Sequence, residues 1–85
     1  MLKISDMKQK EVINIRDGCR FGYLCDMEMN EEGELKSIIV PCPGKVFGMF
    51  GVEKEYHIPW DDISKIGEDI ILVDVDVEKI IVKCD

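Results

Sequence analysis

The chain has 85 residues, of which 46% are hydrophobic and 34% are charged. This length suits one domain, spanning residues 1–85, and the composition is too apolar for intrinsic disorder. The net charge is −7; through Arg20 there are five basic and three acidic residues, and the remainder has six basic against fifteen acidic. Because nucleic-acid binding depends on clustered Lys and Arg, this balance argues against direct contact with DNA or RNA.

The sequence also bears on membrane and export signals. The first ten residues are interrupted by charge too often to form the apolar core of a signal peptide. No apolar run approaches the roughly 20 residues that span a bilayer. We therefore expect a cytoplasmic protein without a membrane span.

The N-terminal half has the pattern of paired strands. Residues 11–15 form a short β-branched run that ends at Asp17-Gly18, a dipeptide typical of hairpin turns because both residues tolerate positive φ. From Phe21 to Asn30, every second residue is apolar, which predicts one continuous strand with one buried face. That face would hold Phe21, Tyr23, Cys25, Met27 and Met29.

A second hairpin and a long loop follow. Gly33 can take a left-handed conformation in a turn, and residues 35–40 then resume extended structure. Pro41 and Pro43 remove backbone donors, so we expect this pairing to end there. The segment from Pro41 to about Lys54 holds three glycines around apolar residues and is interpreted as an apolar loop.

The C-terminal half contains strands around a short helical element. Tyr56, Ile58 and Trp60 would share one strand face, and Asp61 or Asp62 can cap a helical turn. That turn would place Ile63 and Ile66 on one side and stop at Gly67. Residues 70–77 predict another strand, and residues 78–83 predict a last strand or a docking tail. The pattern indicates an all-β fold: a small antiparallel barrel of five to six strands with one short helical turn.

Short motifs occur along nearly the whole chain, namely Glu11-Val12-Ile13-Asn14-Ile15, Asp17-Gly18, Ile39-Val40-Pro41, Pro43-Gly44-Lys45, Phe47-Gly48, Phe50-Gly51, Glu55-Tyr56, Ile58-Pro59-Trp60 and Asp69-Ile70-Ile71-Leu72-Val73. Together they resemble the YlmC/YmxH family of sporulation proteins in the PRC-barrel superfamily. The Pro-Gly-Lys loop joined to Tyr-x-Ile-Pro-Trp is the most specific part of the match.

The resemblance implies a PRC-barrel protein of an endospore-forming Gram-positive bacterium. The superfamily also includes a domain of the photosynthetic reaction-centre H subunit and the C-terminal domain of the RimM ribosome-maturation factors, which serve chiefly as docking modules. The resemblance supplies no catalytic residue. It therefore implies a non-enzymatic role.

Residues that could carry other chemistry are few. Cys19, Cys25, Cys42 and Cys84 are separated by 6, 17 and 42 positions, unlike the close pairs of structural zinc sites. Reduced thiols, a metal site and a regulatory disulfide remain alternatives. His57 has no neighbouring nucleophile and is expected to be structural. We predict no catalytic, cofactor-binding or metal-binding residue.

The leading hypothesis is a protein-interaction module that also self-associates as a homodimer or higher homo-oligomer. Aromatic and apolar side chains on a glycine-hinged loop would supply the contact area typical of interface centres. The candidate partner-binding residues are Lys45, Val46, Phe47, Met49, Phe50, Tyr56 and Trp60. The alternatives are a ribosome or RNA-processing accessory that acts through a protein contact, and a cysteine-based metal- or redox-responsive module.

Overall fold

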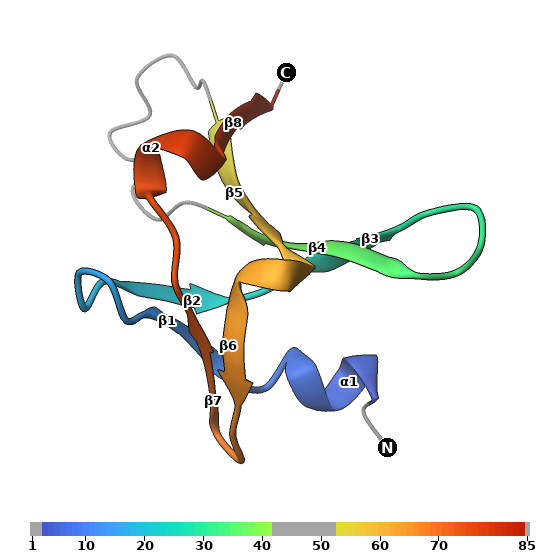
Figure 1. The fold of residues 1–85 in the computed structure, drawn as a ribbon, viewed down its shortest axis with the longest axis horizontal. Coiled ribbons are helices and arrows are strands. Elements are labelled where there is room, and N and C mark those ends of the chain that lie inside the picture. The colour runs from blue at the N-terminus through green and yellow to red at the C-terminus, as the bar shows by residue number, and fades with distance from the viewer. Residues whose placement is uncertain (1–2, 42–52, 85) are drawn as a thin grey trace.

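A computed structural model describes residues 3–41 and 53–84 (Figure 1). In chain order, its elements are α1 (Ile4–Met7), β1 (Glu11–Asn14), β2 (Arg20–Tyr23), β3 (Asp26–Met29), β4 (Leu35–Pro41), β5 (Glu53–Pro59), the 3-10 turn η2 (Trp60–Asp62), β6 (Ile63–Ile66), β7 (Ile70–Val73), α2 (Val77–Ile80) and β8 (Ile81–Cys84).

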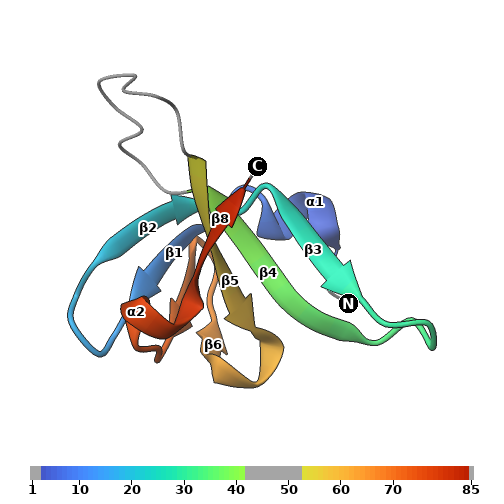
Figure 2. The same cartoon turned by 90° about the horizontal axis from the view of Figure 1, so that it is seen from above.

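The strands form two four-stranded sheets. One has the order β2-β1-β7-β6 and the other the order β3-β4-β5-β8. The chain passes between the sheets from β2 to β3 and again from β5 through η2 to β6, so that the sheets curve around a shared interior (Figure 2). All the strand pairs are antiparallel except β1 with β7, which is parallel. The all-β prediction is confirmed. The predicted antiparallel barrel of five to six strands differs from the structure, because the described residues form eight shorter strands in two separate sheets with one parallel pair, and they do not close into a barrel.

The core draws side chains from both sheets and from both helices. Its buried members are Met7, Val12, Phe21, Leu24, Ile38, Val40, Ile58, Ile71, Val73, Val75 and Ile80. Burial of these apolar side chains is the main favourable term for folding. In a chain of 85 residues this core is small, so single polar contacts at its edge matter for stability.

One predicted strand is wrong. The alternating segment 21–30 is divided into β2 and β3, which lie in different sheets. Phe21 is buried as expected, but Tyr23 is 55% exposed and Leu24 is buried in its place. Gly22 has φ of 97°, a backbone conformation that bends the strand and shifts the side-chain alternation at the corner.

The C-terminal half also differs from its prediction. The helical turn covers only residues 60–62, and Ile63 and Ile66 belong to β6, where they pair with β7. The strand predicted for residues 70–77 ends at Val73. The carboxylate of Asp76 accepts a hydrogen bond from the Glu78 N–H at 3.1 Å, which favours a helical turn, α2, in place of further strand.

Candidate functional site

Two of the seven candidate partner-binding residues lie in the described part of the chain. Tyr56 and Trp60 are half-buried and both pack against the core. The ring of Tyr56 stacks on Phe21 with centroids 4.5 Å apart, at an angle of 32°. Tyr56 lies within β5, where it pairs with Val40, whereas Trp60 is the first residue of η2. Lys45, Val46, Phe47, Met49 and Phe50 lie outside the described residues.

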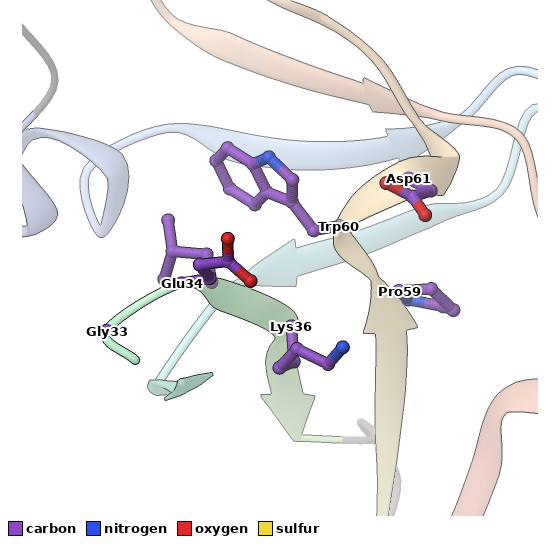
Figure 3. A pocket seen from close by; sticks show the side chains of 7 residues that line it. Gly33, Glu34, Lys36, Pro59, Trp60 and Asp61 are labelled. Carbon is purple, nitrogen blue, oxygen red and sulfur yellow. The ribbon is translucent and has the colours of Figure 1, made fainter. Parts of the chain in front are cut away.

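Trp60 lines a pocket between the β3–β4 turn and η2 (Figure 3). The pairing of Ser37 with Pro59 aligns β4 and β5 so that the start of β4 lies beside the 3-10 turn. The pocket has a volume of about 610 Å³. We call it the Trp60 groove, and its lining residues are Gly33, Glu34, Leu35, Lys36, Pro59, Trp60 and Asp61.

Hydrogen bonds fix the wall of the groove that the β3–β4 turn forms. The side-chain oxygen of Asn30 accepts from the backbone N–H groups of Glu32 at 3.0 Å and of Glu34 at 2.8 Å. The Asn30 side-chain amide donates to Oε1 of Glu34 at 3.0 Å, and the Gly33 N–H donates to the Asn30 carbonyl. Gly33 has φ of 84°. The turn is therefore held in one conformation before any ligand arrives.

Apolar surface extends the groove toward the outer strand. Leu35 is half-buried in the groove, and its partner across the β3–β4 pair is Met29. Met29 is 53% exposed. An exposed methionine opposite a leucine that lines the groove is the kind of surface that interfaces favour, because the flexible methionine side chain adapts to a partner at little cost.

Charge at the groove is mainly negative and unpaired. Glu34 and Asp61 line it, and three more carboxylates lie in the same two elements, Glu31 and Glu32 in the β3–β4 turn and Asp62 in η2. Within residues 3–41 and 53–84, none of the five forms an ion pair with a basic side chain. Elsewhere, Arg16 pairs with Asp74 at 2.9 Å. Lys36 is the one cation among the described residues that line the groove.

A second polar cluster lies on the outer face of the sheet that contains β5. Nε2 of His57 lies 3.1 Å from Oε1 of Glu55, and its Nδ1 lies 3.9 Å from Oε1 of Glu28. The hydroxyl of Ser37 donates to Glu28 at 2.7 Å, not to the imidazole. Because nucleophilic catalysis by serine needs a base within hydrogen-bond reach of the hydroxyl, this arrangement is not a catalytic triad.

Cys19 and Cys25 are the two cysteines whose side chains the structure describes. Cys19 and Cys25 are exposed free thiols, and the side chains of Cys42 and Cys84 lie outside the described set. Burial, followed by the charges of Glu55 and Asp26, raises the pKa of the Cys25 thiol. Among the described residues, no group of three or more potential ligands could hold a metal ion.

Trp60 was predicted from the sequence as a partner-binding residue, but the residues on the other side of the groove were not. Leu35 and Lys36 came from a segment interpreted only as a strand, and Glu34 from one interpreted only as a turn. Their approach to Trp60 depends on the β4–β5 register, which aligns Ser37 with Pro59. One feature of the sequence could have indicated this contact: carboxylates are frequent both in residues 31–34 and in residues 61–62.

Comparison with known proteins identifies the class. Residues 1–80 match the PRC-barrel domain model, and the chain belongs to this family. It is 45% identical over 74 residues to "Probable sporulation protein YlmC" of Bacillus subtilis, covering 86% of this chain and 91% of YlmC. It is 34% identical over 83 residues to the uncharacterized protein YmxH of the same organism, covering 91% of this chain and 93% of YmxH. An uncharacterized protein of Clostridium acetobutylicum is 43% identical over 74 residues, which cover 86% of this chain and 84% of that protein.

These matches confirm the resemblance to the YlmC/YmxH family. Within the described residues, no helix has the length and apolar character needed to cross a membrane.

Proposed function

We propose that this protein is a non-enzymatic PRC-barrel adaptor that binds a protein partner at the Trp60 groove. The observation that carries the proposal is a groove with one fixed wall and a half-buried tryptophan, continued by the exposed side chain of Met29. Tryptophan is among the residues that most often dominate binding energy at interfaces. By similarity to YlmC, the adaptor would act in sporulation, in the cytoplasm.

The chemistry of the groove supports binding over catalysis. Its charged groups are Glu34, Asp61 and Lys36, and its centre is an indole. Catalysis of group transfer needs a nucleophile or a proton-transfer group that is set against a reacting atom. Among the described residues that line the groove there is no serine, histidine or cysteine.

The glycine-rich loop stays in the proposal as a second contact region. The chain leaves β4 at Pro41 and enters β5 at Glu53, whereas Leu35, at the other end of β4, lines the groove. Six residues of strand separate these ends of β4 by about 20 Å. Tyr56, the described candidate of this second region, pairs with Val40 near that end of β4.

Site-specific crosslinking tests the proposal. A photoreactive phenylalanine analogue replaces Leu35 in the groove or, as control, exposed Arg16 in the β1–β2 turn, and the proteins are irradiated in sporulating cells. We expect one crosslinked protein at Leu35, identified by mass spectrometry, that is absent at the control position and is lost when Trp60→Ala is added. Equal crosslinking at both positions, or none at Leu35, would contradict the proposed role of the groove.

A further inference from the structure

We propose that the segment that occupies the Trp60 groove is basic and places an arginine or lysine side chain against Trp60. This inference rests on the proposed function, because it names the class of partner for the same groove. It is carried by two independent observations, the sign of the charge at the rim and the chemistry of the groove centre.

The rim charge comes from both walls. Glu34 of the β3–β4 turn and Asp61 of η2 line the groove, and the same two elements also carry Glu31, Glu32 and Asp62. Since no described basic side chain forms an ion pair with them, their field extends into solvent above the groove. Complementary charge speeds encounter with a basic partner and disfavours acidic ones. A basic segment would neutralise carboxylates that the fold leaves unpaired.

The centre of the groove suits a cation as well. Figure 3 shows the side chains of Glu34 and Asp61 on either side of Trp60. The face of an indole attracts Lys and Arg through its quadrupole, and tryptophan is the best of the aromatic side chains for this contact. A guanidinium could therefore stack on Trp60 while its N–H groups donate to a flanking carboxylate.

A second copy of this chain is a poorer occupant. Its own groove carries the same carboxylates, and most of its N-terminal cations are already engaged. Arg16 pairs with Asp74, Arg20 with Glu11, and the Lys10 ammonium donates to the backbone carbonyl of Gly67. A foreign segment with several unpaired cations fits better.

Trp60 provides a direct readout, because it is the single tryptophan of the chain. The experiment titrates the protein with a capped peptide of four Arg-Gly repeats and, in parallel, with its Glu-Gly counterpart, at low ionic strength, while indole emission is recorded. We expect a saturable change with the Arg-Gly peptide, weakening as salt is added, and no change with the Glu-Gly peptide.

Isosteric variants localise the binding. E34Q/D61N should weaken Arg-Gly binding about tenfold, since two charge pairs are lost. The matched control E68Q/E78Q removes equal charge from the β6–β7 turn and from α2, away from the β3–β4 turn (Figure 1), and should change affinity by less than about twofold. K36Q removes the one cation of the groove and should tighten binding about twofold. A folding defect would weaken peptide binding, so a higher affinity of K36Q cannot result from misfolding.

Several outcomes would overturn the inference. Equal losses for E34Q/D61N and E68Q/E78Q would show that binding follows net charge and not the groove. An unchanged Trp60 spectrum, or equal binding of the Glu-Gly peptide, would remove the basic class of partner. If crosslinking at Leu35 still finds a protein, the proposed function survives that result; if the titration succeeds and crosslinking fails, the proposed function fails instead.

Discussion

Asn14 is the polar side chain that joins β1 to the segment after β7. It is fully buried, and its side-chain amide donates to the Val75 carbonyl at 3.0 Å while its oxygen accepts from the Val75 N–H at 3.1 Å. Both backbone groups of Val75 thus find partners inside the protein. From the sequence, Asn14 was interpreted only as a member of the strand segment 11–15. Nothing in the local sequence indicates that the segment after β7 lies against its side chain.

Replacing Asn14 by Ala should lower the free energy of unfolding by about 2–4 kcal/mol, because the backbone donor and acceptor of Val75 would lose their partners in a buried position. Urea denaturation followed by circular dichroism measures this loss. The control Gln9→Ala, at an exposed position, should change stability by less than about 0.5 kcal/mol. A similar small effect at Asn14 would mean that water replaces its hydrogen bonds.

Cys25 should be a slow nucleophile. Burial and the charges of Glu55 and Asp26 raise the pKa of its thiol, so a smaller fraction is thiolate at pH 8 than in the unfolded chain. In a variant that keeps Cys25 as its single cysteine, we expect iodoacetamide to react more slowly with the folded protein than with the urea-unfolded one, as measured by mass spectrometry. Glu55→Gln should raise the rate at which iodoacetamide reacts with the folded protein. The rate should stay below that of the unfolded protein, because the burial of the thiol remains. A folded rate above the unfolded one would instead support a redox-active thiol.

The β3–β4 turn is the element that shapes the groove, and Gly33 is its constrained position. An added Cβ at Gly33 meets no atom within 4 Å, so Gly33→Ala tests the backbone alone at φ of 84°. We expect a loss of about 1–2 kcal/mol in the free energy of unfolding, from the cost of a left-handed residue with a side chain. Gly33→Asn should lose less, since asparagine tolerates this region.

Gly67→Ala is the matched control for the turn. It lacks a left-handed φ, and its added Cβ would meet Ile70 atoms at 3.5 Å, an ordinary contact distance. Its stability should change by less than about 0.5 kcal/mol in either direction. If Gly33→Ala is equally harmless, the β3–β4 turn must change conformation freely, and a preformed groove wall is excluded.

The elements that the sequence predicted well are those fixed by local chemistry. The Asp17-Gly18 and Gly33 turns each join antiparallel strands, as expected from residues that tolerate positive φ. The bend between β2 and β3 was not predicted, because it depends on how the two sheets pack around one core and not on local residue preferences. No local preference at Tyr23 or Leu24 indicates which of them points inward.

The candidate site also has a part that the local sequence predicts and a part that depends on the folded sheet. Trp60 could be selected from residue type and motif, since a tryptophan after Ile-Pro stands out in a short chain. The residues opposite it, Glu34 to Lys36, are 24 or more positions away in sequence. They meet Trp60 only through the pairing of β4 with β5, and register is a property of the folded sheet.

On the scale of the whole molecule, negative charge governs which surfaces can meet. The net charge is −7, and the outer strand β3 carries Asp26 and Glu28, both exposed. An edge strand offers unpaired backbone groups to any extended chain, and like charges facing each other oppose pairing between identical copies. The predicted self-association must therefore form against electrostatic repulsion.

This repulsion gives self-association and partner binding opposite salt dependences. Screening shortens the Debye length from about 30 Å at 0.01 M salt to about 8 Å at 0.15 M. Sedimentation equilibrium should consequently show more dimer as salt rises, whereas the affinity for an Arg-Gly peptide should fall over the same range. If the β3 edge is the interface, the double variant Asp26→Asn/Glu28→Gln should dimerise at a lower salt concentration than the unchanged protein. A dimer that weakens with salt would instead require contacts between opposite charges. The N-terminal cations would then supply the positive side of those contacts.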